Sequence, residues 1–296
     1  MGRKRRNDDG SEQGSGSGGE DGYSSSASSG GGGSGSDADS TSSGASEDIV
    51  NIDFEYFSPA EIDFHAMKRM LVGSFGDDAE EFDLGELVDL VLAQSAIGST
   101  VKMEDDADPY AFMTAVGLRA HAGKKVVQQI TGYLRRKDKG GRLGAVLDGH
   151  SALLLNERVV NMPPQIVPPM LRMLGAELQQ AAAAGEPFDF EHLVLVCPMF
   201  REVPQAESDS DSDSAQRRRP QRPAQPPIDA YAHPEDEIIE EFAQLKFDFG
   251  LSRSSRVPAA RNAFADAGLA PSRRCLVLRR ADIPALAARL EEALAP

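Results

Sequence analysis

Residues 151–170 read SALLLNERVVNMPPQIVPPM, and this stretch joins a strand to a helix through a proline-rich corner. The apolar residues of 151–160 predict a strand. Pro164 suits the first position of a helix, because that position needs no N–H donor. Pro168 and Pro169 come about one turn later and predict a kinked or loosened opening turn. We call residues 161–170 the proline elbow.

Strand and helix patterns alternate on both sides of this stretch. Apolar alternation or continuous apolar runs predict strands at 50–56, 100–103, 111–118, 151–160, 193–199, 245–251 and 275–278. Amphipathic periodicity predicts helices from 59 to 73 or 76, from 84 after the cap residue Asp83, and at 124–136, 164–184, 234–244 and 286–294. Ser58 and Glu61 have the spacing of a capping box for the first helix, and residues 104–109 form an acidic turn. The alternation predicts an α/β sandwich.

Two segments lack the apolar residues that a core requires. Residues 1–48 are rich in Ser, Gly and acidic residues, which predicts a disordered tail, and residues 205–227 predict a disordered polar insert. The remaining chain predicts a single α/β domain over residues 49–296, interrupted by the insert. That length suffices for one sizeable core.

Both polar segments carry candidate signals. The tail begins with four basic residues that an import receptor can bind, Arg3, Lys4, Arg5 and Arg6, although a solvated charge run is the alternative. The insert carries three serines that each precede an aspartate, Ser208, Ser210 and Ser212. These are candidate phosphorylation sites for an acid-directed kinase, and a plain acidic linker is the alternative. The basic start predicts a nuclear protein.

The formal net charge of −16 argues against a general nucleic-acid binder and favours a basic protein as partner. We expect no membrane span, because no apolar run is long enough, and no secretory leader. The two cysteines, Cys197 and Cys275, lie in apolar runs. Two buried thiols in an intracellular protein are the first expectation, and a disulfide is the alternative.

Catalytic patterns are weak, so we expect no enzyme, no cofactor and no bound metal. None of the histidines has the spacing of a metal site; they are His65, His121, His150, His192 and His233. No nucleophile elbow or Walker glycine loop is present. Residues 137–144 form the one Gly-rich basic stretch, but it follows a helix, whereas phosphate loops open one.

The proline elbow has two interpretations: a rigid structural corner, or a preorganised docking ridge for a partner. The second predicts that the elbow and neighbouring acids bind a partner protein through Asn161, Met162, Pro163, Pro164, Gln165, Ile166, Val167 and Met170. Glu157 and Arg158 are expected to form a local ion pair or to be solvated. They are not expected to be catalytic.

The folded part resembles the BCCIP family of eukaryotic proteins. The stretches that carry the resemblance are residues 50–57, 81–94, 97–102, 153–161, 162–166 and 240–247. An acidic or Ser-rich N-terminal tail is also usual in that family. The long Gly/Ser tail and the Ser-Asp/Arg insert depart from the family pattern.

The resemblance implies a twisted mixed β-sheet packed by helices, similar to the GNAT acetyltransferases but without a working acyl-CoA site. A GNAT enzyme holds the pyrophosphate with the amides of a Gly-rich loop between a strand and a helix. This chain has the proline elbow there.

The resemblance also implies a non-enzymatic nuclear adaptor and chaperone that shuttles to the cytoplasm. Such a protein binds a basic large-subunit ribosomal protein and supports ribosome biogenesis and nuclear export. Family members are linked to a phosphoinositide kinase, to actin and to vesicle traffic. A genome-maintenance and cell-cycle scaffold for a recombination mediator and a cyclin-dependent-kinase inhibitor is the alternative, and a GNAT-type acyltransferase is a more remote one.

Overall fold

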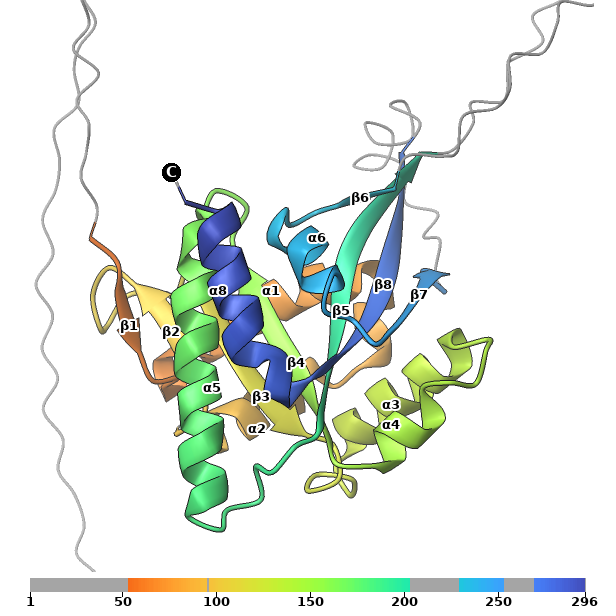
Figure 1. Ribbon diagram of the computed structural model, residues 1–296, viewed down its shortest axis with the longest axis horizontal. Coiled ribbons are helices and arrows are strands. Elements are labelled where there is room, and N and C mark those ends of the chain that lie inside the picture. Colours follow the sequence, from red (N-terminus) through yellow and green to blue (C-terminus); the bar gives the residue numbers. More distant parts are fainter. Residues whose placement is uncertain (1–52, 95, 203–228, 253–268, 296) are drawn as a thin grey trace, which may run out of the picture. The chain divides into compact units, whose positions relative to one another are not determined.

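The computed structural model describes residues 53–94, 96–202, 229–252 and 269–295, and within them eight strands form one mixed sheet (Figure 1). The strands are β1 Glu55–Phe57, β2 Ser99–Lys102, β3 Ala111–Gly117, β4 Ser151–Arg158, β5 His192–Glu202, β6 Asp229–Tyr231, β7 Leu245–Gly250 and β8 Leu269–Arg279. Their order is β1-β2-β3-β4-β5-β8-β7, and β6 pairs with β5. The pairing of β4 with β5 is parallel, and the others are antiparallel.

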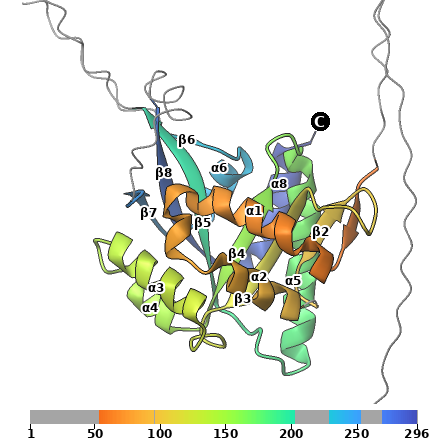
Figure 2. The same ribbon diagram turned by 180° about the vertical axis from the view of Figure 1, so that it is seen from behind.

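Helices cover both faces of this sheet. The α-helices are α1 Phe64–Phe75, α2 Leu84–Ala93, α3 Lys125–Lys137, α4 Gly144–Asp148, α5 Val167–Ala183, α6 Glu235–Glu240 and α8 Ile283–Ala293, with short 3-10 turns at Glu61–Asp63, Gly76–Glu81, Pro164–Ile166 and Arg280–Asp282. Helices α5 and α8 pack together on one face (Figure 1), and α1 and α2 lie on the other (Figure 2). The mixed α/β architecture expected from the sequence is confirmed.

Each face of the sheet has its own apolar core, and the central strand β4 contributes side chains to both. Leu153 and Leu155 belong to the core beneath α1, α2 and α3, whereas Leu154 belongs to the core beneath α5 and α8. Alternate side chains of a strand point to opposite faces. The continuous apolar run of β4 therefore fills both cores.

The parallel strands β4 and β5 separate along their length. They pair only where Ser151–Leu153 meets His192–Val194, and both strands lie wholly within the described residues. Their later halves diverge, as the spreading green and cyan strands in Figure 1 show. Buried charged residues lie in the later half of β4, where Glu157 and Arg158 are less than one tenth exposed.

The start of the first helix differs from the sequence prediction. The predicted Ser58 capping box is wrong, because the first helical turn is a 3-10 turn that begins at Glu61. Its opening amide, that of Ala60, donates to Asp63 Oδ2 at 2.9 Å. Asp63 is held inward by a buried lysine described below. The predicted cap Asp83 is confirmed, since its Oδ1 accepts from the Glu86 amide at 3.3 Å.

Most other elements lie where expected, with shifted ends. The predicted helix at 234–244 is only α6, and the last predicted strand is longer, since β8 pairs with β5 along its whole length. The proline elbow opens with the 3-10 turn Pro164–Ile166, so the α-helix that the sequence predicts from residue 164 begins only at Val167. The predicted tail 1–48 and insert 205–227 lie outside the described residues. No described helix is long and apolar enough to span a membrane.

Candidate partner-binding surface

The apolar side chains of the proline elbow do not form an exposed docking ridge. Met162, Ile166, Val167 and Met170 are all less than one tenth exposed and pack in the core beneath α5 and α8. That part of the predicted surface is wrong, because these side chains fill the space between the sheet and α5. The exposed members of the predicted set are Asn161, Pro163 and Gln165, and Pro164 is half-buried.

Arg158 holds the elbow in place from the end of β4. Its guanidinium forms two hydrogen bonds with the Glu235 carboxylate, at 2.7 and 2.9 Å, and its Nη1 donates to the Met162 carbonyl at 2.6 Å. The expected local pair of Glu157 and Arg158 is therefore wrong: successive strand residues face opposite sides. Arg158 joins β4, the elbow and α6 as a structural corner.

The segment between β4 and the elbow is exposed and apolar. Val160 is 89 % exposed, and Val159 is 38 % exposed. The Val159 amide donates to the Tyr110 carbonyl at 2.9 Å, so this segment continues alongside the beginning of β3. Two adjacent valines on the surface are apolar area available to a partner.

An acidic turn lies at the same edge of the sheet. It joins β2 to β3 and exposes four acids, Glu104, Asp105, Asp106 and Asp108. The Tyr110 amide donates to the Val101 carbonyl at 2.8 Å, and its hydroxyl lies 3.2 Å from the sulfur of exposed Met103. The end of β2, the start of β3 and the end of β4 therefore lie in a row. We call this surface, Met103–Asp108 with Val159–Asn161, the acidic corner.

A buried lysine anchors the acidic corner. Lys102 Nζ lies 2.7 Å from Asp63 Oδ1 and donates to the Asp105 carbonyl at 2.9 Å. Its ammonium also lies 5.6 Å from the ring centroid of Phe57. Lys102 thus ties the acidic turn to the segment that leads into α1. The turn's carboxylates are held on a fixed backbone, which lowers the conformational cost of binding.

A second buried polar group lies where β4 separates from β5. Burial raises the pKa of Glu157 to about 8, and the neighbouring Ser74 hydroxyl and Arg273 guanidinium offset this only in part. Arg273 Nη2 donates to the Gly73 carbonyl at 3.1 Å, near the end of α1. These contacts link three elements beneath one face of the sheet.

The opposite face carries a further acid. Burial, and then the charge of Glu235, raise the pKa of Asp236 well above its ordinary value. Burial, and then Asp236, likewise raise the pKa of the Cys197 thiol. A thiol with a raised pKa is a poor nucleophile. Cys197 and Cys275 are free and buried, which confirms the expectation of two thiols.

The Gly-rich stretch 137–144 does not form an anion cradle. The amides of Gly140 and Leu143 both donate to the buried Asp138 carboxylate, at 3.2 and 2.6 Å. They therefore point inward and are unavailable to a phosphate. Within the described residues, no group of His, Cys, Asp and Glu side chains is arranged to hold a metal ion.

Two of the predicted signals fall outside the described residues: Arg3, Lys4, Arg5 and Arg6 in the tail, and Ser208, Ser210 and Ser212 in the insert. Sequence reasoning recognised the acidic turn as a turn but missed the acidic corner. The strand register that brings Val159 beside Tyr110 was needed to find it.

Comparisons with known proteins agree with the architecture. A family model described as BCCIP matches residues 49–239. Protein bcp1 of Emericella nidulans is 33 % identical over 86 % of this chain and 91 % of that protein, and Protein bcp1 of Schizosaccharomyces pombe is 33 % identical over 83 % and 90 %. A crystal structure of BCP1 from Saccharomyces cerevisiae is similar at a TM-score of 0.56 and 24 % identity, covering 86 % of this chain and 94 % of that one. That structure supports the fold.

Proposed function

This chain belongs to the BCCIP family, and on that premise we propose that it is a non-enzymatic nuclear adaptor and chaperone. Its client in this proposal is a basic ribosomal protein of the large subunit, which it holds during ribosome biogenesis and nuclear export. Links to protein transport, the actin cytoskeleton and vesicular transport follow from the same family resemblance.

The acidic corner is the observation that carries this proposal. It combines four exposed acids, of which Asp108 pairs with Arg69 at 2.7 Å, with the exposed side chains of Met103, Val159 and Val160. The net charge of −16 accelerates the encounter with a basic client. The apolar side chains then supply contacts that salt does not screen, and Lys102 keeps the turn in one arrangement.

The strand-to-helix corner after β4 favours binding over acyl transfer. An acyl-CoA pyrophosphate is held by backbone N–H groups that converge at the start of a helix. The prolines 163, 164, 168 and 169 have no N–H group to offer there. The proposed likeness to the GNAT fold therefore comes without a working acyl-CoA site. Calorimetric titration with acetyl-CoA tests this, and we expect no heat of binding.

The nuclear part of the proposal rests on the basic residues 3–6 and on the family resemblance. A shuttling adaptor would also meet nuclear transport factors, and a phosphoinositide kinase is a further proposed partner. Replacing the four basic residues with alanine should reduce nuclear accumulation of the fluorescently tagged full-length chain. An unchanged distribution would remove this stretch as the import signal.

The alternative scaffold role in genome maintenance and the cell cycle uses the same binding chemistry with different partners. The chaperone and scaffold roles are separated by co-expression with each large-subunit ribosomal protein, followed by gel filtration at about 0.3 M salt. At this salt concentration, charges are screened beyond a few ångströms, so nonspecific charge pairing is weak. We expect one ribosomal protein to co-elute. If none does, while a recombination mediator or a cyclin-dependent-kinase inhibitor co-elutes, the scaffold role takes its place.

A further inference from the structure

A basic groove lies beside β7, an edge strand of the sheet, on a chain that is acidic overall. It has a volume of about 420 Å³ between β7, the last strand of the sheet order, and the loop that joins α3 to α4. Its basic lining residues are Arg136, Lys137, Lys139, Arg142 and Arg201. Among the described residues that line it, two are acids, Asp138 and Asp248, and the Asp138 carboxylate accepts from the loop's own amides.

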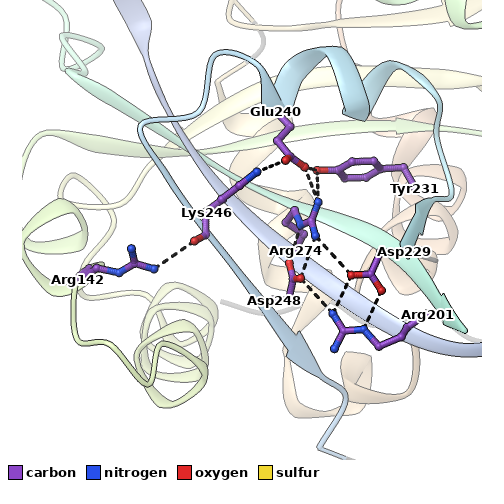
Figure 3. Close-up of polar contacts among 8 residues, drawn as sticks. All are labelled: Arg142, Arg201, Asp229, Tyr231, Glu240, Lys246, Asp248 and Arg274. Carbon is purple, nitrogen blue, oxygen red and sulfur yellow. Dashed lines mark hydrogen bonds and ion pairs between the residues drawn. The ribbon is translucent and has the colours of Figure 1, made fainter. Parts of the chain in front are cut away.

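The cations of this groove differ in how far they are neutralised. Arg201 forms ion pairs with Asp229 at 2.8 Å and with Asp248 at 3.1 Å (Figure 3). Arg142 instead donates to the Lys246 carbonyl at 3.2 Å, as Figure 3 also shows. Within the described residues, no carboxylate lies within ion-pair distance of Arg142 or Lys139. Both side chains are exposed and can pair with an added anion.

The donors of the groove suit an extended acidic peptide better than a single phosphate ion. The loop amides of Gly140 and Leu143 are already bonded to Asp138, so no backbone cradle is left for one phosphate. Arg136 pairs with Glu81 at 2.9 Å and Lys137 lies 3.5 Å from Asp78. The available donors are therefore the long side chains of Lys139 and Arg142, in the loop between α3 and α4. Several carboxylates on one chain can pair with them at the same time.

The chain itself carries such a peptide shortly after Arg201 in the sequence. Residues 207–213 read ESDSDSD and begin six residues after Arg201, which lines the groove. Six residues span up to about 20 Å when extended, and a short tether raises the local concentration of a ligand to the millimolar range. We propose that residues 207–213 dock in the basic groove and that phosphorylation of Ser208, Ser210 and Ser212 strengthens this docking.

Phosphorylation strengthens the docking because each phosphate adds about 1.5 to 2 negative charges and pairs well with Arg and Lys side chains. The proposal does not depend on the identity of the client at the acidic corner. It gives the chain an internal contact that a kinase can regulate, at the sheet edge opposite β1.

A spin label in the full-length chain tests this. Cys197 and Cys275 are buried and are the only cysteines of the chain, so Ala215→Cys supplies a single accessible thiol for a nitroxide. Broadening of backbone amide signals would be measured before and after treatment with an acid-directed serine kinase. We expect selective broadening at residues 139–142 and 246–250, greater after phosphorylation.

Two double variants with equal charge changes, one in the groove and one outside it, make the test specific. Lys139→Glu with Arg142→Glu should reduce the broadening about fivefold, as the loss of two exposed charge pairs predicts. Lys124→Glu with Lys125→Glu, at the start of α3, should leave it unchanged. Broadening that survives the first pair, or that phosphorylation does not increase, would overturn the proposal. The proposal would also be overturned if a free acidic peptide bound in the groove while residues 207–213 of the same chain did not.

Discussion

Lys102 Nζ lies 2.7 Å from Asp63 Oδ1, and neither side chain has any exposed surface. This buried ion pair joins β2 to the turn before α1, and the same ammonium group binds the Asp105 carbonyl of the acidic turn. One buried cation thus determines the shape of an exposed anionic surface. Stability and client binding should therefore respond together to changes at Lys102.

Replacing Lys102 with Met leaves the Asp63 carboxylate buried without its cation. We expect a loss of about 3–5 kcal/mol in the free energy of unfolding, the usual cost of breaking a buried pair from one side. Urea denaturation of the full-length chain measures it.

Two comparisons make this prediction specific. The double variant Lys102→Met with Asp63→Asn should recover part of the loss, because no charge then stays buried. Lys125→Met, which breaks the exposed 3.5 Å contact with Asp83, should cost less than about 1 kcal/mol. Equal losses at Lys102 and Lys125 would contradict the assigned role of the buried pair.

Glu157 should make the protein less stable as the pH rises. Its pKa is about 8 in the folded protein, above its ordinary value, so the folded state holds an additional proton between about pH 4.5 and pH 8. The free energy of unfolding is therefore highest at low pH, and it decreases as the pH rises through that range, because ionised Glu157 is less favourable in the folded than in the unfolded protein. The variant Glu157→Gln is neutral at every pH in this range, so it lacks this pH dependence.

We therefore expect the stability of Glu157→Gln relative to the wild type to increase between pH 5 and pH 9, by up to about 4 kcal/mol at 1.4 kcal/mol per pKa unit. Thermal unfolding at both pH values measures this difference, and Glu186→Gln at an exposed position controls for the lost charge. A relative stability that does not change with pH would show that Glu157 is ionised in the folded protein.

The burial of the proline elbow predicts opposite outcomes at neighbouring residues. Ile166→Asp should destabilise the domain by more than about 3 kcal/mol, since it places a charge in the core beneath α5. Gln165→Asp, one residue earlier on the exposed side, should change stability by about 0.5 kcal/mol or less. Denaturant unfolding of both variants decides this, and an Ile166→Asp variant as stable as the wild type would restore the exposed-ridge interpretation.

The sequence predicted most strands and helices, because periodicity reports directly on burial, but it did not predict the short elements α4 and β6. It could not show whether the apolar side chains of the proline elbow are exposed or buried. Ile166 and Val167 have the same apolar character whether they face a partner or α5, and their rigid corner fits both interpretations. The structure decides for α5, since both side chains are buried.

Contacts between distant residues were beyond the reach of local patterns. Arg158 pairs with Glu235, 77 residues away, and the sequence offered the adjacent Glu157 as its partner. The acidic corner was missed for the same reason. Its acids and its valines are separated by a long stretch of chain, and only the register of β2, β3 and β4 brings them to one edge.

The acidic corner is the central claim, and a matched pair of charge reversals tests it. The corner variant combines Glu104→Lys and Asp106→Lys with the uncharged change Val160→Ser, so its net charge changes by as much as that of the control. The control variant combines Glu186→Lys with Glu191→Lys, beyond the far end of α5, which is about 25 Å long at 1.5 Å per residue over Val167–Ala183. Both sets lie on exposed residues, so both proteins should fold.

The deciding measurement is the affinity of each variant for the co-eluting ribosomal protein, by calorimetry at about 0.3 M salt. We predict that the corner variant binds at least tenfold more weakly, about 1.4 kcal/mol, and that the control stays within about twofold of the wild type. Equal weakening of both variants would mean that only the overall negative charge attracts the client. Unchanged affinity of the corner variant would contradict the account directly.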